Sequence, residues 1–239
     1  LKMILPKDQK ETEDQENSQN RVQIIDQLVG EYVSKCSPKV TREALQILPK
    51  LMYALRDSSS QDIIDVFQAI RQAIQQSGSQ QDSIHTPKMK VLLDVISSIG
   101  RQNVIPVMEF LIEQNYVEPS QAASLISTIS LTVKPTDQVV NAFMPSAKLY
   151  TLSLVRNTPY VRKAALLASG TILHGFRKAQ RNEPNPPAVY REHIERYTKE
   201  MQELYRQSED ESEKVAILKA ISNSGIPEFL QFLRECIDQ

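Results

Sequence analysis

Histidine and cysteine side chains are the residues of this sequence best suited to bind a metal or to act as nucleophiles. There are five of them: His85, His174, His193, Cys36 and Cys236. A zinc site needs three or four converging ligands, and neither a C-x-x-C pair nor an H-E-x-x-H motif brings any of these together. We therefore expect no metal, no cofactor and no enzymatic activity. A Cys–His pair assembled only in the fold is an alternative that the sequence leaves open.

The surroundings of these side chains favour structural roles. His174 lies in an apolar run beside a glycine, and we expect it to be packed or to face a loop. His193 stands among charged residues, and we expect it on a solvated face. Two cysteines do not define a disulfide framework, and the sequence does not decide whether Cys36 and Cys236 are free or bonded.

Motifs for nucleotide binding and hydrolysis are missing as well. The sequence contains no G-x-x-x-x-G-K-[ST], no G-x-G-x-x-G and no G-x-S-x-G. The pair Ser169-Gly170 lies inside an apolar run, where we interpret it as a point at which two helices approach closely.

One cluster of basic residues is a candidate docking patch. It consists of Arg162, Lys163, Arg177, Lys178 and Arg181. Cations are favourable near the C-terminus of a helix, and this alone explains part of the cluster. The alternative is a docking site for an acidic neighbouring domain or a lipid headgroup.

Composition excludes several classes of protein. The chain has 239 residues, 41% of them hydrophobic, and a formal net charge of −1. This charge gives no reason to expect nucleic acid as a partner, because nucleic-acid binding usually requires a basic surface. No run of apolar residues is long enough to span a membrane. Since the sequence begins with Leu1, we expect it to be a piece of a larger protein.

The elements that must position these side chains are all helices. From Val22 onward apolar residues recur at helical spacing, and no two neighbouring runs alternate as strands do. Capping residues mark helix starts near Ser60, Pro87, Pro119, Asp137, Pro159 and Ser208, with Glu211 completing a capping box at the last of these. Gly100 and Gly225 mark helix ends, and we expect a kink or break at Pro49.

About eleven short helices joined by short loops favour a helical-pair solenoid over a single bundle. The predicted fold is all-α, a two-layered, horseshoe-shaped α-superhelix over residues 21–239. Residues 1–20 are predicted to be a linker or mobile segment, because residues 7–20 (KDQKETEDQENSQN) are polar and lack an apolar period. Residues 92–100 (LLDVISSIG) align with 217–225 (ILKAISNSG), and residues 165–170 (ALLASG) form a looser third copy. A generic helix–glycine–helix corner would look similar.

Three segments resemble one known family. Residues 214–236 (KVAILKAISNSGIPEFLQFLREC) are similar to a stretch in the helical domain of the large lipid transfer proteins. These are the vitellogenins, apolipophorins, apolipoprotein B and the microsomal triglyceride transfer protein. Residues 92–129 and 161–173 (VRKAALLASGTIL) are similar to two further stretches, in the same order. The chain differs in having two cysteines where vertebrate members often carry several. The resemblance therefore does not imply their disulfides for this chain, and it suggests an invertebrate-type member.

The resemblance implies a scaffold role. In that family the helical domain follows a β-barrel and wraps around β-sheets that line a lipid cavity. The implied partners are these neighbouring β-barrel and β-sheet domains, and phospholipid and neutral lipid through the intact parent. The implied location is secreted, and vitellogenin and apolipophorin are not distinguished. The alternative is a HEAT-like helical adaptor for protein–protein interaction.

Overall fold

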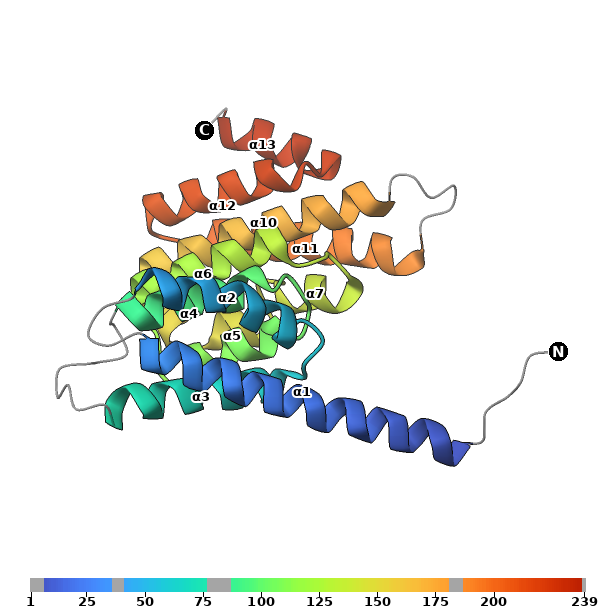
Figure 1. Ribbon diagram of the computed structural model, residues 1–239. Helices are drawn as coiled ribbons and strands as arrows, with labels where there is room; N and C mark the ends of the chain where they lie inside the picture. The colour runs from blue at the N-terminus through green and yellow to red at the C-terminus, as the bar shows by residue number, and fades with distance from the viewer. Residues whose placement is uncertain (1–6, 36–40, 77–86, 181–186, 238–239) are drawn as a thin grey trace. The chain divides into compact units, whose positions relative to one another are not determined.

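The structure is a computed structural model that describes residues 7–35, 41–76, 87–180 and 187–237. Every regular element in these ranges is a helix, and they contain no strand (Figure 1). The prediction of an all-α fold is therefore confirmed. None of the described helices is long and apolar enough to cross a membrane.

The chain divides into two compact units, Leu1–Ile96 and Ser97–Gln239. The helices of the first unit are α1 (Lys7–Lys35), α2 (Arg42–Leu55), α3 (Ser60–Gln76) and most of α4 (Pro87–Ser98). Helix α1 packs against both α2 and α3. The described part of α1 contributes Ile25 and Tyr32 to the core, and the partners supply residues such as Leu51 from α2 and Phe67 from α3, all of them buried.

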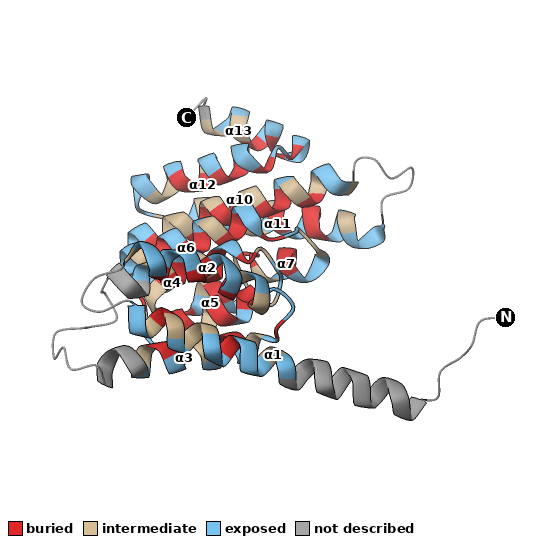
Figure 2. Ribbon diagram, in the orientation of Figure 1, coloured by how far each residue is buried: buried red, intermediate tan, exposed pale blue. Residues whose placement is uncertain are grey.

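The second unit contains the remaining helices. They are α5 (Val104–Glu113), α6 (Pro119–Thr132), α7 (Asp137–Ala142), α8 (Lys148–Thr151), α9 (Ser153–Asn157), α10 (Pro159–Gln180), α11 (Ala188–Gln207), α12 (Glu211–Ser224), the 3₁₀ turn η1 (Pro227–Phe229) and α13 (Leu230–Ile237). Helix α10 is the central element, with α6 packed on one side and α12 on the other. Figure 2 shows that the buried residues of these helices lie on the faces turned toward neighbouring helices.

Contacts between helix ends show that α10 and α12 run parallel. At their starts, Lys163 Nζ donates a hydrogen bond to Ser212 Oγ at 2.7 Å. In their middles, Gly170 faces the backbone of Ala220. At their ends, His174 and Arg177 lie against Gly225, which follows α12.

Helix α6 runs in the same direction as α10. Gly175, near the end of α10, faces Pro135 just beyond the end of α6. Helices α6, α10 and α12 thus lie side by side in one row. Within the second unit the end of α4 also belongs to this row, because Thr132 Oγ1 at the end of α6 donates a hydrogen bond to Ser97 O at 2.9 Å. Helices α5, α7 and α11 contact members of this row and return the chain between them. Two layers of helices are the hallmark of a helical-pair solenoid, as predicted, and the horseshoe curvature stays a prediction.

The two glycines aligned in the sequence repeat occupy equivalent places. Gly100 follows α4 and Gly225 follows α12, and both have left-handed backbones with φ of 68° and 62°. A residue with a Cβ is strained in this conformation, whereas glycine adopts it freely. The third copy differs, because Gly170 lies inside α10, which continues to Gln180.

Several predicted helix boundaries need correction. Residues 7–20 were expected to be a linker or mobile loop, and in the structure they are helical and form the first half of α1. This stretch is rich in Glu, Gln and Lys, which favour helix even without an apolar face. Whether it links two domains stays a prediction.

The expectation for α2 is decided in part, and the one for α12 needs correction. Helix α2 is not broken at Pro49, and Leu51 and Leu55 beyond the proline are buried in the core. A kink at Pro49 stays a prediction. The N-cap of α12 is Asp210, whose side chain accepts from Ser212 N at 2.8 Å. Ser208 lies outside the helix and instead donates to Glu213 at 2.8 Å.

The predicted close approach at Ser169-Gly170 is confirmed. A Cβ built on Gly170 would overlap the carbonyl oxygen of Ala220 and lie 3.0 Å from its carbonyl carbon. A main-chain atom inside a helix cannot rotate away as a flexible side chain can. The absence of a side chain at position 170 therefore sets the distance between α10 and α12.

We expect Gly170→Ala to lower the free energy of unfolding by about 1–3 kcal/mol, because the methyl group forces two packed helices apart. Without that overlap, alanine would stabilise a helix by about 1 kcal/mol relative to glycine. Urea unfolding followed by circular dichroism measures the change. Gly30→Ala in α1 is the matched control, since nothing lies within 4 Å of a Cβ there. If both variants were equally stable, the close contact between α10 and α12 would be disproved.

Candidate functional site

The predicted basic cluster is divided between the two ends of α10. Arg162 and Lys163 lie in its first turns, and Arg177 and Lys178 in its last turn. Fifteen residues of α-helix separate Arg162 from Arg177, which corresponds to about 22 Å. Arg181 lies outside the described residues. The four described cations therefore do not form one compact patch.

The first pair, Arg162 and Lys163, forms contacts with other residues of the chain. Arg162 Nε forms an ion pair with Glu213, whose side chain is only 16% exposed, and Lys163 binds Ser212. Both contacts fasten the start of α12 to the start of α10. Arg177 and Lys178 lie where the helix dipole favours cations. Docking of an acidic partner at this second end stays a prediction.

Both described histidines have structural surroundings. His193 was expected on a solvated face, but its side chain is only 8% exposed and its Nε2 meets Asp137 Oδ1. Its ring also stands edge-on to Phe176, with 5.5 Å between ring centroids. The expectation was wrong because the partner Asp137 lies in α7, far away in sequence. His174 is exposed and covers the turn at Gly225.

The remaining candidate ligands give no cluster. In the described ranges no three His, Cys, Asp or Glu side chains are placed to hold a metal ion. His85 and Cys36 lie outside the described residues, so a Cys–His pair involving either is untested. Cys236 is a free, half-buried thiol next to Tyr205, and this neighbour raises the pKa of the Tyr205 phenol.

A buried group of hydroxyls lies between α10, α11 and the α8 segment. Ser169 Oγ donates to Leu166 O at 2.6 Å and lies 3.1 Å from the Tyr197 hydroxyl. Burial raises the pKa of both Tyr150 and Tyr197 far above the ordinary value, and the nearby Ser169 hydroxyl opposes this only in part. Phenols with such pKa values stay neutral at physiological pH. They can hold helices together but are poorly suited to act as bases or nucleophiles.

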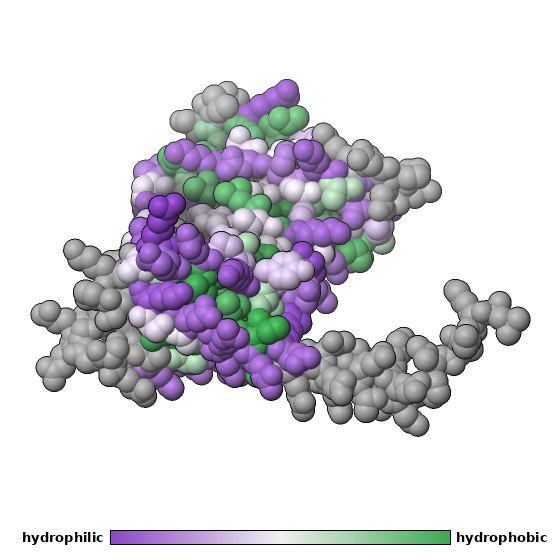
Figure 3. Space-filling view, in the orientation of Figure 1, coloured by the Kyte–Doolittle hydropathy of each residue, from purple (hydrophilic) through white to green (hydrophobic). Residues whose placement is uncertain are grey.

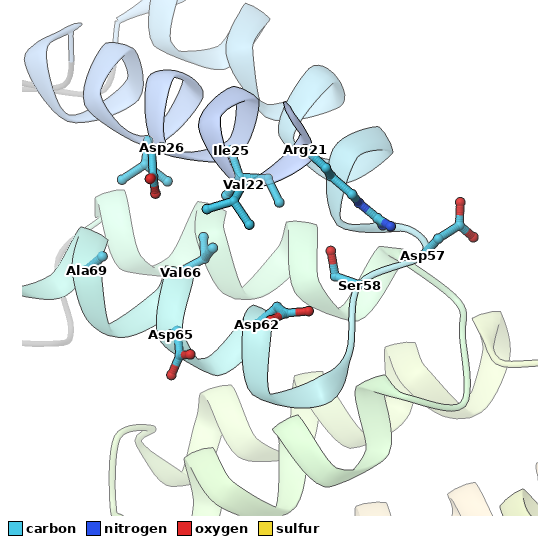
Figure 4. A pocket seen from close by; sticks show the side chains of 11 residues that line it. Arg21, Val22, Ile25, Asp26, Asp57, Ser58, Asp62, Asp65, Val66 and Ala69 are labelled. Atoms are coloured by element: carbon cyan, nitrogen blue, oxygen red, sulfur yellow. The ribbon is translucent and has the colours of Figure 1, made fainter. Parts of the chain in front are cut away.

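The first unit contains a groove between α1 and α3 with a volume of about 470 Å³ (Figure 4). We call it the α1–α3 groove. Its floor is apolar and its rim is charged. The lining consists of Arg21, Val22, Ile25, Asp26, Val29, Asp57, Ser58, Asp62, Asp65, Val66 and Ala69.

The charged side chains of the groove differ in how firmly hydrogen bonds hold them. Arg21 is fixed, because its Nε and Nη2 both donate to Ala54 O at 3.0 Å. Asp62 accepts from Ser59 N at 3.0 Å and so holds the start of α3. Asp65 accepts from Gln61 at 2.8 Å on the exposed side of the same helix. Asp26 is exposed on α1.

Sequence reasoning did not find this groove. The only signal for it in the sequence is an aspartate, Asp26, placed among the apolar residues Val22, Ile25 and Val29. An amphipathic helix commonly carries such a boundary residue. The groove becomes visible only when α3 is placed beside α1.

The described residues define an all-α solenoid domain without an evident catalytic site. The chain belongs to the family described as the vitellogenin TPR domain, whose model matches residues 19–239. This confirms the resemblance to the large lipid transfer proteins, and places the chain among the vitellogenin-like domains of lipoproteins.

Individual relatives agree with this family. Vitellogenin-1 of Caenorhabditis elegans is 26% identical over 151 residues, which are 63% of this chain and 9% of that protein. Vitellogenin-5 of the same organism is 24% identical over 140 residues, 58% of this chain and 8% of that protein. The chain therefore spans less than a tenth of these relatives. A structure titled "Lipid-protein interactions in lipovitellin" has the same fold, with a TM-score of 0.66, 19% identity, and coverage of 90% of this chain and 20% of that one.

The buried phenols predict a loss of stability in alkali. The unfolded chain releases its tyrosine protons near the ordinary pKa of 10.0, whereas folded Tyr150 and Tyr197 keep theirs to higher pH. Above about pH 10 the unfolded state binds fewer protons, so stability falls as pH rises. Between about pH 9 and pH 11 we expect Tyr150→Phe/Tyr197→Phe to lose less stability than the natural chain, by about 1 kcal/mol for each phenol removed.

Urea unfolding at the two pH values measures this difference. The matched control is Tyr53→Phe/Tyr160→Phe, which removes two phenols that are 73% and 50% exposed. If both double variants reduced the alkaline loss of stability by the same amount, that loss could not be assigned to the two buried phenols.

Proposed function

We propose that this domain is a scaffold of a secreted, lipid-carrying protein of the vitellogenin type. In this role it performs no chemistry and braces the β-sheets that hold lipid, with a β-barrel and β-sheet domains of the same protein as its partners. Phospholipid and neutral lipid would be carried by that whole protein. The proposal is supported by the family and by the names of the relatives.

The observation that carries the proposal is that the apolar faces of the helices are buried against neighbouring helices. On α10, for example, Val161, Leu166 and Leu173 are at most 1% exposed, and this helix packs against several neighbours, chiefly α6 and α12. Among the residues whose burial the structure describes, the large apolar side chains that remain exposed are distributed over seven helices: Val22, Ile24, Leu45, Tyr53, Leu131, Tyr160, Val189, Val215 and Leu230. Figure 3 accordingly shows a largely hydrophilic face with small hydrophobic areas. Apolar surface used for packing is not available to hold lipid in quantity.

The polar contacts suit the same role. Arg162–Glu213 joins α10 to α12, and His193–Asp137 joins α11 to α7. Glu200 on α11 accepts from both Ser146 N at 3.0 Å and Ser146 Oγ at 2.6 Å. Each of these contacts fixes one helix relative to another segment, which is what a rigid support requires.

The alternative function is a HEAT-like adaptor that binds protein segments. The α1–α3 groove is the observation that favours it. The two functions differ in what the chain binds on its own, because a scaffold for lipid-holding sheets needs no lipid of its own and an adaptor needs a peptide.

We expect the 239-residue chain to take up little lipid by itself. It is incubated with vesicles of fluorescent phosphatidylcholine and separated by flotation, with vitellogenin-1 of C. elegans as the positive control. The expected ratio of lipid to protein is at least about tenfold lower for the chain, since its apolar stripes are covered by neighbouring helices. Uptake equal to that of the control would contradict the scaffold role and make the helices themselves the lipid-binding surface.

A further inference from the structure

We propose that the α1–α3 groove binds a basic amphipathic segment of another protein. Apolar side chains of the segment would lie on the groove's floor, and its lysine or arginine side chains would meet the aspartates of the rim. The proposal rests on the groove itself and does not depend on the lipid-carrying role.

The floor offers apolar surface that the fold leaves uncovered. Figure 4 shows Val22 and Ile25 of α1 directed toward Val66 of α3. Ile25 is buried, whereas Val22 is 54% exposed, so part of the apolar surface of α1 at the groove is uncovered. Covering such a side chain is favourable for any occupant with apolar groups of its own.

The rim selects the charge of the occupant. Four aspartates line the groove, Asp26, Asp57, Asp62 and Asp65, together with one cation, Arg21. Asp57 also forms an ion pair with Arg56, with 3.9 Å between Arg56 Nε and Asp57 Oδ1. The guanidinium of Arg21 is also held by two hydrogen bonds that it donates to Ala54 O. This excess of negative charge is local, because the whole chain carries only −1. The resulting field attracts cationic side chains and repels phosphate-bearing headgroups.

The size of the groove suits a peptide face. Its volume of about 470 Å³ is that of a small-molecule pocket, for which about 300–1,000 Å³ is typical, so it can take some side chains of one face of a bound segment. Two helices form its walls, and a third amphipathic helix laid between them is a common way of recognising peptides. A segment with apolar residues at helical spacing and lysines beside them matches both the floor and the rim.

The binding test uses a designed peptide. A fluorescent peptide of about 18 residues, with leucines on one helical face and lysines elsewhere, is titrated with the 239-residue chain and followed by anisotropy. A second peptide has glutamate in place of every lysine. We expect saturable binding of the lysine peptide, weakening as salt is raised because the charges become screened, and no binding of the glutamate peptide.

Charge variants locate the site. Asp26→Asn/Asp65→Asn removes two rim charges, and asparagine at position 65 keeps an oxygen that can accept from Gln61. Asp62 is left intact because it holds the start of α3. We expect roughly five- to tenfold weaker binding. The matched control is Glu192→Gln/Glu203→Gln, which removes the same charge from exposed positions of α11 and should bind like the natural chain.

Apolar variants test the floor independently. Val22→Gln should weaken binding severalfold, since it replaces the exposed apolar side chain at the groove. Ile24→Gln is the matched control, because Ile24 is equally exposed, at 52%, on the same helix but does not line the groove. Both positions are exposed enough to be substituted without disturbing the core.

Three results would overturn the proposal. The first is failure of the lysine peptide to bind saturably. The second is equal weakening by the groove variants and their controls, which would mean that total charge or general hydrophobicity governs binding. The third is preferential binding of vesicles containing anionic phospholipid, weakened by Val22→Gln, which would make the groove a lipid contact.

Discussion

The second unit depends on the direct contact between the backbones of α10 and α12. Because Gly170 has no side chain, α10 can approach Ala220 until main-chain atoms touch. The neighbouring contacts follow from this distance. Arg162 reaches Glu213 at one end, and His174 and Arg177 reach the turn at Gly225 at the other. The parallel arrangement of α10 and α12 is thus fixed at three levels along the pair.

Polar groups then hold the returning layer, which consists of the helices that connect successive members of the row, against this row. Tyr197 of α11 meets Ser169, the residue before Gly170, inside the core. His193, one turn earlier, is held by Asp137 of α7 and by Phe176 of α10. Buried hydroxyls and a buried imidazole need partners of defined geometry. They therefore determine how α11 is rotated, which an apolar stripe alone does not determine.

Local sequence signals predicted the helices, and tertiary contacts explain where prediction failed. The starts at Pro119, Asp137 and Pro159 and the ends at Gly100 and Gly225 depend on residues a few positions apart, and they agree with the structure. The burial of His193 depends on Asp137, which lies 56 residues earlier and has no local signature. The α1–α3 groove depends on the separation of two helices, which no periodicity contains. The close packing at Gly170 was predictable, because glycine destabilises a helix interior and its presence in an apolar helix indicates a contact that leaves no room for a side chain.

The stacked row has an uneven period, and this has a consequence for how such a domain can change. Contacts between successive members of the row join residues 35 apart from Ser97 to Thr132, but 49 apart from Lys163 to Ser212. The return between α6 and α10 consists of three very short helices, whereas α11 is the helix that the described residues place between α10 and α12. The spacing of the row is thus independent of the length of chain that connects its members. Insertions and deletions can accumulate in the returning layer while the row keeps its geometry, so descendants of one ancestor can retain the architecture after their sequences have ceased to align.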